Sequence, residues 1–209
     1  MNIIKYGRDA GNNPEQNIKA PKGKRVLGFL DGSYWIVNNG SCRGCLMQEN
    51  RNKLPVYMKP VFEDRDLIVT QDAEFPVPGF YIVSPRKHFG SIANFPVKLS
   101  QKIGLVTHFI RRGMRNQLGI EFAEIFHEER FKNSHYHHWI LPCWEYGFDK
   151  SGSTPTIFKS KVDGYRKYEP NIVNYLRSFV FKLEEKRILE FNAKMAKYLN
   201  SKTILKYYE

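Results

Sequence analysis

Residues 134–142 have the sequence SHYHHWILP, in which three histidines fall within four positions. If this segment is a β-strand, its side chains alternate between two faces. His135 and His137 then share one face, whereas His138 points to the other. Two histidines on one face can serve related purposes, because one imidazole can bind a metal while the next meets a substrate. This segment is therefore the first candidate for a functional site.

Two of the three cysteines, Cys42 and Cys45, form a C-x-x-C motif. An odd number of cysteines, in a chain whose N-terminus lacks a signal peptide, does not indicate a disulfide framework. The motif follows a turn-like NNGS rather than an evident strand-to-helix junction, which favours metal binding over a redox pair. The third cysteine, Cys143, is predicted to be structural.

A structural zinc ion takes four tetrahedral ligands, commonly cysteine and histidine. His88 follows the apolar segment YIVSPRK, and His135 opens the histidine strand. Together with the C-x-x-C motif they make a set of two cysteines and two histidines. We therefore predict a structural zinc site at Cys42, Cys45, His88 and His135, which would hold the histidine strand in place.

The elements that must position these residues follow from hydrophobic patterns. Apolar runs and alternation predict strands at 25–37 (two, around a turn at Asp31–Gly32), 61–70, 79–84, 121–127 and 135–141. Apolar residues at steps of three and four predict a helix over 97–118, with Ser100 as its N-cap. Strands, then a helix, then strands indicate an α+β fold with a mostly antiparallel sheet and a helix packed on it.

The C-terminal part is predicted to be a basic loop followed by a long helix. Pro170 can occupy the first turn of a helix, and apolar residues then recur on one face: Ile172, Leu176, Phe179, Leu183, Ile188, Phe191, Met195 and Leu199. This stripe would pack on the rest of the chain or on a second subunit. The chain thus divides into an irregular N-terminal segment (1–24), a compact domain (25–149) and a basic helical extension (150–209).

Positive charge is concentrated at the C-terminal end. Residues 150–209 carry about +7 of the net charge of +12. A basic region can bind nucleic acid through counterion release, although it can equally be a solvated helix surface. No run of about 18 apolar residues predicts a membrane span, and without a signal peptide the expected location is the cytoplasm.

The segment HYHHWILP resembles the signature of the histidine-triad (HIT) family, in which histidines alternate with apolar residues and a proline often follows. The stretch VFEDRDLIVTQDAEFPVPGFYIVSPRKHFGSIANF is similar to the strand–loop–strand segment of that family. The C-x-x-C motif, His88 and His135 together resemble its zinc-bearing branch, which includes galactose-1-phosphate uridylyltransferases and some bacterial HIT hydrolases. The resemblance covers about residues 40–145 and implies a HIT-like fold for that part.

By position, the resemblance implies a role for several residues. His137 aligns with the nucleophile that attacks the α-phosphate of a nucleotide and forms a covalent nucleotidyl-histidine. Asp72 aligns with an acidic residue that holds the ribose hydroxyls, and Asn133 and Ser134 align with polar groups near the phosphates. The implied function is a nucleotide hydrolase or nucleotidyltransferase that needs no catalytic metal.

Trp139 stands where the family has a histidine or a glutamine, so it would face the substrate. An indole donates only through its N–H and cannot accept a proton. A second function therefore stays open, a non-catalytic module that binds a nucleotide or, through the basic tail, nucleic acid. An enzyme that processes nucleic-acid ends would combine both functions. HIT domains are commonly dimers, which allows a homodimer here.

Overall fold

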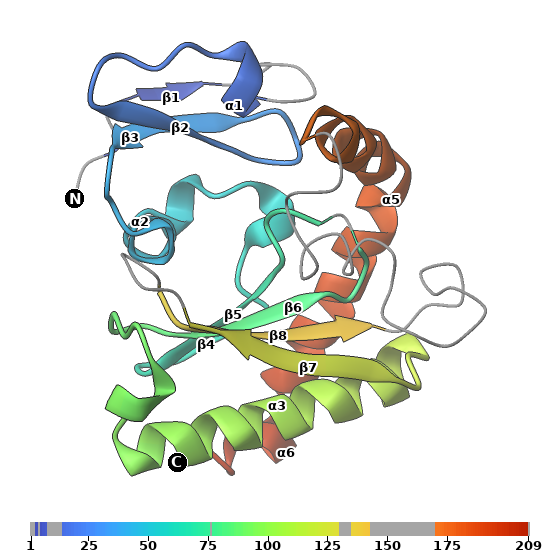
Figure 1. Cartoon of the computed structure of the whole chain (residues 1–209). Helices are drawn as coiled ribbons and strands as arrows, with labels where there is room; N and C mark the ends of the chain where they lie inside the picture. Colours follow the sequence, from blue (N-terminus) through green and yellow to red (C-terminus); the bar gives the residue numbers. More distant parts are fainter. Residues whose placement is uncertain are drawn as a thin grey trace.

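The computed structural model (Figure 1) describes residues 3, 5–7, 14–75, 77–129, 135–142 and 170–208, without the side chains of 6, 16, 128 and 170–180. Its strands are β1 (Lys5–Gly7), β2 (Lys24–Gly28), β3 (Tyr34–Asn38), β4 (Phe62–Glu63), β5 (Leu67–Gln71), β6 (Tyr81–Pro85), β7 (Ala123–Glu128) and β8 (His137–Pro142). Its helices are α1 (Pro14–Asn17), α2 (Arg43–Glu49), α3 (Val97–Leu118), α5 (Pro170–Leu199) and α6 (Lys202–Leu205), with short 3-10 turns at Arg51–Lys53, Val56–Met58 and Ile92–Asn94.

The described strands form two sheets. The smaller sheet has the order β1-β3-β2, and the larger has the order β4-β5-β6-β8-β7. The strand pairs in both sheets are antiparallel. With α3 packed on the larger sheet and a helix at the C-terminal end, the structure confirms the predicted α+β fold class.

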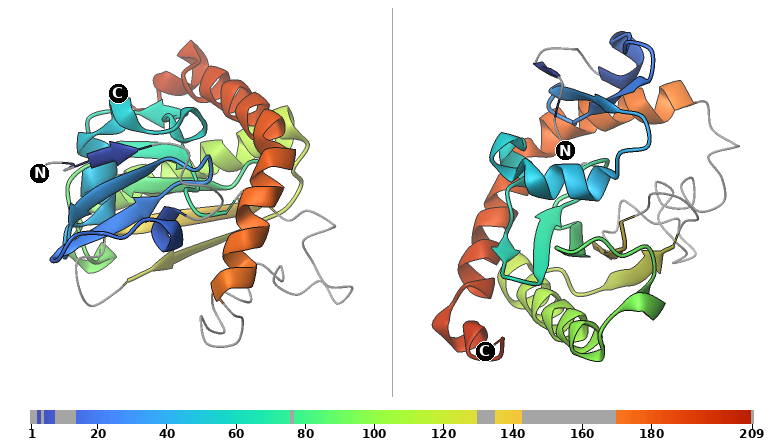
Figure 2. Two further views of the ribbon diagram at one scale, coloured as in Figure 1. Left: turned by 90° about the horizontal axis from the view of Figure 1, so that it is seen from above. Right: turned by 90° about the vertical axis from the view of Figure 1, so that its left-hand side faces the viewer.

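The larger sheet lies between two layers (Figure 1). Helix α3 covers one face, and α2 with the smaller sheet lies over the other face. Helix α5 runs along the side of the molecule from the smaller sheet to α3, as the views in Figure 2 also show. The residues of the predicted site meet in the layer between the larger sheet and α2.

Three hydrophobic clusters hold these layers together. The cluster between α3 and the larger sheet includes Val69, Val83, Val106, Ile110 and Ile140. The cluster among the smaller sheet, α2 and α5 includes Leu27, Trp35, Leu46, Tyr57 and Ile188. A small cluster of Phe75, Phe80, Trp139 and Leu141 lies on the face of the larger sheet that is opposite α3. Full burial of each such side chain contributes about 1.5–3 kcal/mol to stability.

The predicted helix over 97–118 is confirmed as α3, but Ser100 is not its N-cap. The helix begins directly after Pro96, whose carbonyl oxygen accepts hydrogen bonds from the amides of Leu99 and Ser100 at 2.8 and 3.3 Å. Proline can precede the helix because this position needs no backbone N–H. The helix ends at Gly119, which has a left-handed φ of 69°.

The run 61–70 forms two strands, β4 and β5, instead of the single predicted strand. Asp64 Oδ1 accepts hydrogen bonds from the amides of Asp66 and Leu67 at 2.8 and 2.9 Å, and this turn interrupts the run. The other predicted strands agree with β2, β3, β6 and β7 to within a few residues at their ends.

The N-terminal segment that was predicted to be irregular contains two short elements. Strand β1 pairs with β3, and the carboxylate of Glu15 in α1 accepts a hydrogen bond from the Gly28 amide at 3.0 Å. The prediction was wrong for these elements because they are too short to show a periodic pattern, and contacts with the smaller sheet decide their conformation. The three-part division of the chain stays a prediction.

Helix α5 confirms the predicted C-terminal helix. The second half of the predicted apolar stripe is buried against the same chain, at Ile188, Phe191, Met195 and Leu199. The first part of the stripe, Ile172, Leu176 and Phe179, lies outside the described side chains. None of the described helices is apolar over the length that a membrane crossing requires.

Leu183 was wrongly assigned to the packing stripe, because its side chain is 68% exposed. Phe181, two residues earlier and about 200° away around the helix, is buried instead. Its ring contacts that of Tyr57 at a centroid distance of 4.9 Å. The packing partner therefore decides which side of α5 is buried at this point, and the apolar residues alone do not.

Candidate metal centre and adjoining cavity

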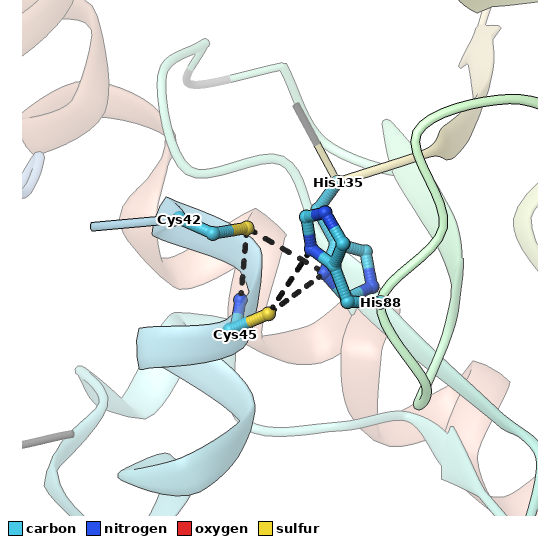
Figure 3. Close-up of side chains that lie close together, drawn as sticks. All are labelled: Cys42, Cys45, His88 and His135. Atoms are coloured by element: carbon cyan, nitrogen blue, oxygen red, sulfur yellow. Dashed lines mark hydrogen bonds between the residues drawn. The ribbon is translucent and has the colours of Figure 1, made fainter. Parts of the chain in front are cut away.

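Four potential metal ligands come from three separate parts of the chain. Cys42 precedes α2 and Cys45 lies in its first turn, whereas His88 follows β6 and His135 precedes β8. One ligand atom from each residue lies within 4.8 Å of those of the other three, and Figure 3 shows these side chains converging. The structure thus brings together the four residues that the sequence predicts as zinc ligands.

The start of α2 places the C-x-x-C motif. Cys42 is the N-cap, and its Sγ accepts a hydrogen bond from the Cys45 amide at 3.5 Å. Gly44 allows the histidine segment to approach, because a Cβ at this position would lie 2.6 Å from Cβ of His135. The motif lies at the start of α2, after a turn that follows β3, and β3 pairs antiparallel with β1 and β2, so among the described residues this is not the βαβ setting of a redox C-x-x-C motif.

His135 is oriented by a hydrogen bond on the side of its ring that faces away from the cysteines. Its Nε2 lies 2.7 Å from the carbonyl oxygen of Pro85, so Nε2–H donates and Nδ1 carries the lone pair. Nδ1 lies 3.4 Å from Sγ of Cys45 and 3.7 Å from Sγ of Cys42. Burial lowers the pKa of His135, which favours the neutral imidazole that a metal requires.

His88 and Cys45 are less buried than Cys42 and His135. His88 is exposed, and its Nδ1 lies 3.3 Å from Sγ of Cys45. Burial and the neighbouring Cys42 raise the pKa of the Cys45 thiol to about 12. In the absence of a metal this thiol therefore keeps its proton near neutral pH, and binding of a cation to the sulfur must displace it.

A cavity of about 490 Å³ adjoins this cluster, and His135 lines both. The larger sheet contributes Ile68, Thr70, Gln71, Ile82, Ser84, His137 and Trp139, and the loop after β5 contributes Asp72, Ala73 and Glu74. The layer above it contributes Arg25, Gly40, Ser41, Arg43, Gly44, Met47, Gln48, Leu54 and Met58. A mixed polar and apolar cavity of this volume can hold a small molecule.

Strand β8 starts at His137 and not at His135 as predicted. The amide of Tyr136 donates to the carbonyl oxygen of Phe89 at 2.6 Å and so does not join the ladder. The alternation of faces holds nevertheless, because His135, His137 and Trp139 line one cavity. His138 pairs across the strands with His127 on the opposite face.

The ring of His137 is oriented by the backbone. Its Nδ1 lies 3.0 Å from the carbonyl oxygen of His135, which makes Nδ1–H the donor and leaves the lone pair on Nε2. His135 therefore has two roles. Its imidazole belongs to the cluster of potential metal ligands, and its backbone carbonyl orients His137.

Trp139 forms an apolar side of the cavity. It is 5% exposed, and its ring packs edge-on against Phe126 and Phe80 at centroid distances of 5.0 and 6.4 Å. The centroid of the His137 ring lies 4.9 Å from that of Trp139. A base or another flat apolar group in the cavity would therefore meet an aromatic surface beside His137.

Asp72 lines the cavity and also holds the loop that follows β5. Its Oδ1 accepts hydrogen bonds from the amides of Glu74 and Phe75, both at 2.7 Å. Arg43 Nη1 lies 2.8 Å from the carboxylate of Glu74, which links the same loop to α2. The loop-capping role is therefore present in the structure, and the ribose-binding role stays a prediction.

Several predicted residues cannot be placed, and some cavity residues were missed. Asn133, Ser134 and Cys143 lie outside the described residues. Sequence reasoning did not select Arg25 or Arg43, although Arg43 lies inside the C-x-x-C motif. Arg25 had no such signal, because only the packing of the smaller sheet over the larger one brings it to the cavity.

No protein-family model matches the chain, and no curated protein matches it either. Several solved structures are similar. A zinc-bound histidine triad family protein from Mycobacterium smegmatis is 16% identical and covers 70% of this chain and 96% of its own, with a TM-score of 0.44. A hypothetical histidine triad nucleotide-binding protein from Sulfolobus tokodaii is 20% identical over 77% and 97%, with a TM-score of 0.46. A HIT family member from Bacillus subtilis is 19% identical over 68% and 95%, with a TM-score of 0.44.

Proposed function

We propose that this chain is a HIT-type nucleotide hydrolase or nucleotidyltransferase in which His137 attacks the α-phosphate. The hydrogen bond of 3.0 Å between His137 Nδ1 and the His135 carbonyl oxygen carries the proposal. It holds the tautomer in which the Nε2 lone pair is the nucleophile, at the edge of a cavity large enough for a nucleotide. The resemblance of this strand to the HIT signature supports the same role.

In the first step a bond forms between Nε2 and the α-phosphorus, and the bond from phosphorus to the leaving group breaks. The electron pair departs with the leaving group, while the Nδ1 proton stays on the ring and the His135 carbonyl accepts its hydrogen bond. In the second step water or another acceptor attacks phosphorus and loses its proton to solvent, and the phosphorus–nitrogen electron pair returns to Nε2. Two displacements thus allow either hydrolysis or transfer.

The other substrate contacts follow from the cavity lining and the resemblance. The carboxylate of Asp72 would hold the ribose, since it lines the cavity and its loop is anchored to α2. Asn133 and Ser134 would contact the phosphates. Trp139 would pack against the base or the sugar and would take no part in proton transfer.

We also propose that Cys42, Cys45, His88 and His135 bind a structural zinc ion. Two thiols and two imidazoles are a donor set that zinc prefers, and their ligand atoms already converge. A bound zinc would link α2 to the segments around His88 and His135. Because the His135 carbonyl orients His137, the zinc would position the nucleophile without taking part in the chemistry.

Intact-protein mass spectrometry with nucleoside 5′-phosphoramidates and dinucleoside polyphosphates tests the proposed reaction. We expect the wild type to show turnover, or a nucleotidyl adduct, that disappears in His137→Ala. His138→Ala is the matched control, because this histidine is adjacent but lies on the opposite face of β8. Activity that persists in His137→Ala, or zinc-loaded wild type that gives neither adduct nor turnover, would contradict the proposal.

Trp139 favours one alternative, a module that binds a nucleotide or nucleic acid without chemistry. Its buried ring occupies the position where the family has a polar or proton-exchanging group. Binding of an oligonucleotide through the basic tail should weaken steeply between about 50 and 200 mM salt, whereas binding of a mononucleotide in the cavity should change much less. Tight binding without turnover, measured at both salt concentrations, would support this alternative.

Three features predicted from the sequence stay predictions for the whole chain. They are nucleic-acid binding through residues 150–209, a homodimer, and a cytoplasmic location. Size-exclusion chromatography with light scattering would test the dimer directly.

A further inference from the structure

Among the described residues that line the cavity, no histidine is left to protonate a leaving group. His137 is the proposed nucleophile, and the proton of His135 is donated to a backbone oxygen at 2.7 Å. Trp139, at the position where the family has a polar group, does not act as an acid near neutral pH. The reaction must therefore suit a leaving group that needs no proton from these side chains.

The two carboxyl groups in the cavity lining already have an ion-pair or hydrogen-bond partner. Glu74 is paired with Arg43 at 2.8 Å, and Asp72 accepts two backbone hydrogen bonds of 2.7 Å. An amine leaving group, whose conjugate acid has a pKa of about 10, must take up a proton as it departs. A phosphate, whose second pKa is about 6, can depart as an anion near neutral pH.

Arg25 supplies a positive charge for such an anion. It lies on β2, lines the same cavity as His137, and donates from Nη2 to the Ser41 carbonyl oxygen at 2.6 Å. Among the described residues, its buried Nε has no hydrogen-bond partner and its guanidinium makes no ion pair with a carboxylate. Arg43 differs, because Glu74 neutralises it. A guanidinium that is held in place and still has N–H groups available as donors is well suited to bind a phosphate group.

We infer that Arg25 binds the phosphate of the leaving group, so that the preferred substrates are nucleotides whose α-phosphate is joined to a further phosphate. This inference rests on the proposed function and names its substrate class. Arg25 lies outside the stretch that resembles the HIT family, so the smaller sheet adds this specificity to the cavity. Nucleoside phosphoramidates, which lack a second phosphate, would be poor substrates.

In the step that Arg25 assists, the bond from the α-phosphorus to the bridging oxygen breaks as the bond to His137 Nε2 forms. The electron pair remains on the bridging oxygen, and the departing phosphate carries the additional negative charge. The Arg25 guanidinium stabilises this charge by hydrogen bonding and Coulomb attraction, which grow as the bond breaks. No proton transfer to the leaving group is required.

The test compares a dinucleoside polyphosphate with a nucleoside phosphoramidate of the same base, using the zinc-loaded chain of 209 residues. We expect the wild type to prefer the polyphosphate. Arg25→Gln should lower kcat/KM for the polyphosphate by about 10- to 100-fold and for the phosphoramidate by less than about threefold. Arg25→Lys should restore part of the loss. Arg65→Gln, a surface arginine with a 93% exposed side chain, is the charge-matched control.

The outcomes separate this inference from the proposed function. Equal losses on both substrates in Arg25→Gln would show a structural role of the Ser41 hydrogen bond and would overturn the inference, as would a wild type that prefers the phosphoramidate. In both cases turnover through His137 would stand. A wild type that acts on neither substrate would overturn the proposed function, and the inference with it. Zinc content and melting temperature of each variant show whether it is folded.

Discussion

His137 and His138 are adjacent in the sequence and lie on opposite faces of β8, where their surroundings differ. The ring of His137 lines the cavity, and its Nδ1 is held by a backbone oxygen at 3.0 Å. The ring of His138 faces the α3 side, and both of its nitrogens are buried without a hydrogen-bond partner among the described residues. Burial, with His127 and His137 nearby, lowers the pKa of His138 to about 4.

The difference shows that the face of the strand, and not the residue type, decides what a histidine can do. On the cavity side one nitrogen is oriented, so the imidazole has a defined tautomer for reaction. On the α3 side the imidazole is neutral, and its unpaired nitrogens cost about 1–3 kcal/mol of stability. Experiments on the two faces should therefore give opposite results.

The largest expected effect comes from replacing His137 and His138 in two separate variants. His137→Gln should lower activity at least about 1,000-fold with little change in stability, because it removes the nucleophile. His138→Phe should keep most of the activity and raise the free energy of unfolding by about 1 kcal/mol, because a buried unpaired group is replaced by an apolar one. Steady-state kinetics and urea denaturation measure both. Comparable losses of activity in the two variants would show that the faces are not functionally distinct.

Loss of the proposed zinc should affect the cavity side of β8. Cys45→Ser should abolish the binding of one zinc per chain and lower stability by about 4 kcal/mol at saturating zinc, because the ion binds only the folded state. Activity should fall as well, since His135 no longer holds the backbone oxygen that orients His137. Elemental analysis and thermal melting with and without chelator test this, and Cys143→Ser should retain the zinc. A Cys45→Ser protein with full zinc content would exclude the proposed ligand set.

A smaller effect is expected from a methyl group beside the ligands. Gly44→Ala would place Cβ 2.6 Å from Cβ of His135, so the histidine must shift. We expect zinc affinity to fall by about 10- to 100-fold, the size of effect seen when the surroundings of a ligand are disturbed. Competition with a fluorescent zinc chelator measures this affinity.

The control for Gly44→Ala is Gly104→Ala on α3. A Cβ at Gly104 meets no atom within 4 Å, so alanine should leave zinc binding unchanged and raise stability by up to about 1 kcal/mol through its helix propensity. Equal zinc affinities in the two alanine variants would show that His135 is not held as closely to α2 as the structure indicates.

The smallest effect concerns the α3 side and depends on pH. The unfolded chain binds a proton at His138 below a pKa of about 6.5, whereas the folded chain does so only near 4. Stability from this histidine is therefore complete above about pH 6.5 and is lost as pH falls toward 4, by at most about 1.4 kcal/mol per pH unit. Denaturation from pH 7 to 4 should show a shallower loss in His138→Phe. A loss of the same steepness in both proteins would mean that His138 titrates normally in the fold.

The sequence predicted the parts of the site that depend on local geometry. Alternation along β8 correctly separated His138 from His137, and the pairing of a C-x-x-C motif with His88 and His135 anticipated a cluster that the structure assembles. Side-chain direction in a strand, and the spacing of the two cysteines within one helical turn, are set by a few consecutive residues. His88 and His135 were grouped with the cysteines because two thiols and two imidazoles are a donor set typical of zinc.

Other features could not be predicted because they depend on contacts between distant segments. Arg25 reaches the cavity only because the smaller sheet lies over the larger one. Phe181 is buried in place of Leu183 because Tyr57 lies on that side of α5. Strand β1 forms because β3 offers it an edge. No pattern within each of these segments contains that information.

The sequence by itself determined the α+β class, the span of α3 and the faces of the histidine strand, because backbone geometry imposes periods of 3.6 and 2 on any segment that buries one side. Only the tertiary structure decided that Arg25, Asp72 and His137 line one cavity, and that this cavity adjoins the cluster of Cys42, Cys45, His88 and His135. The physical reason is that these residues lie on separate elements, whose positions follow from how the sheets and helices pack against one another. Packing joins residues across the whole chain, whereas periodicity acts only within a single element.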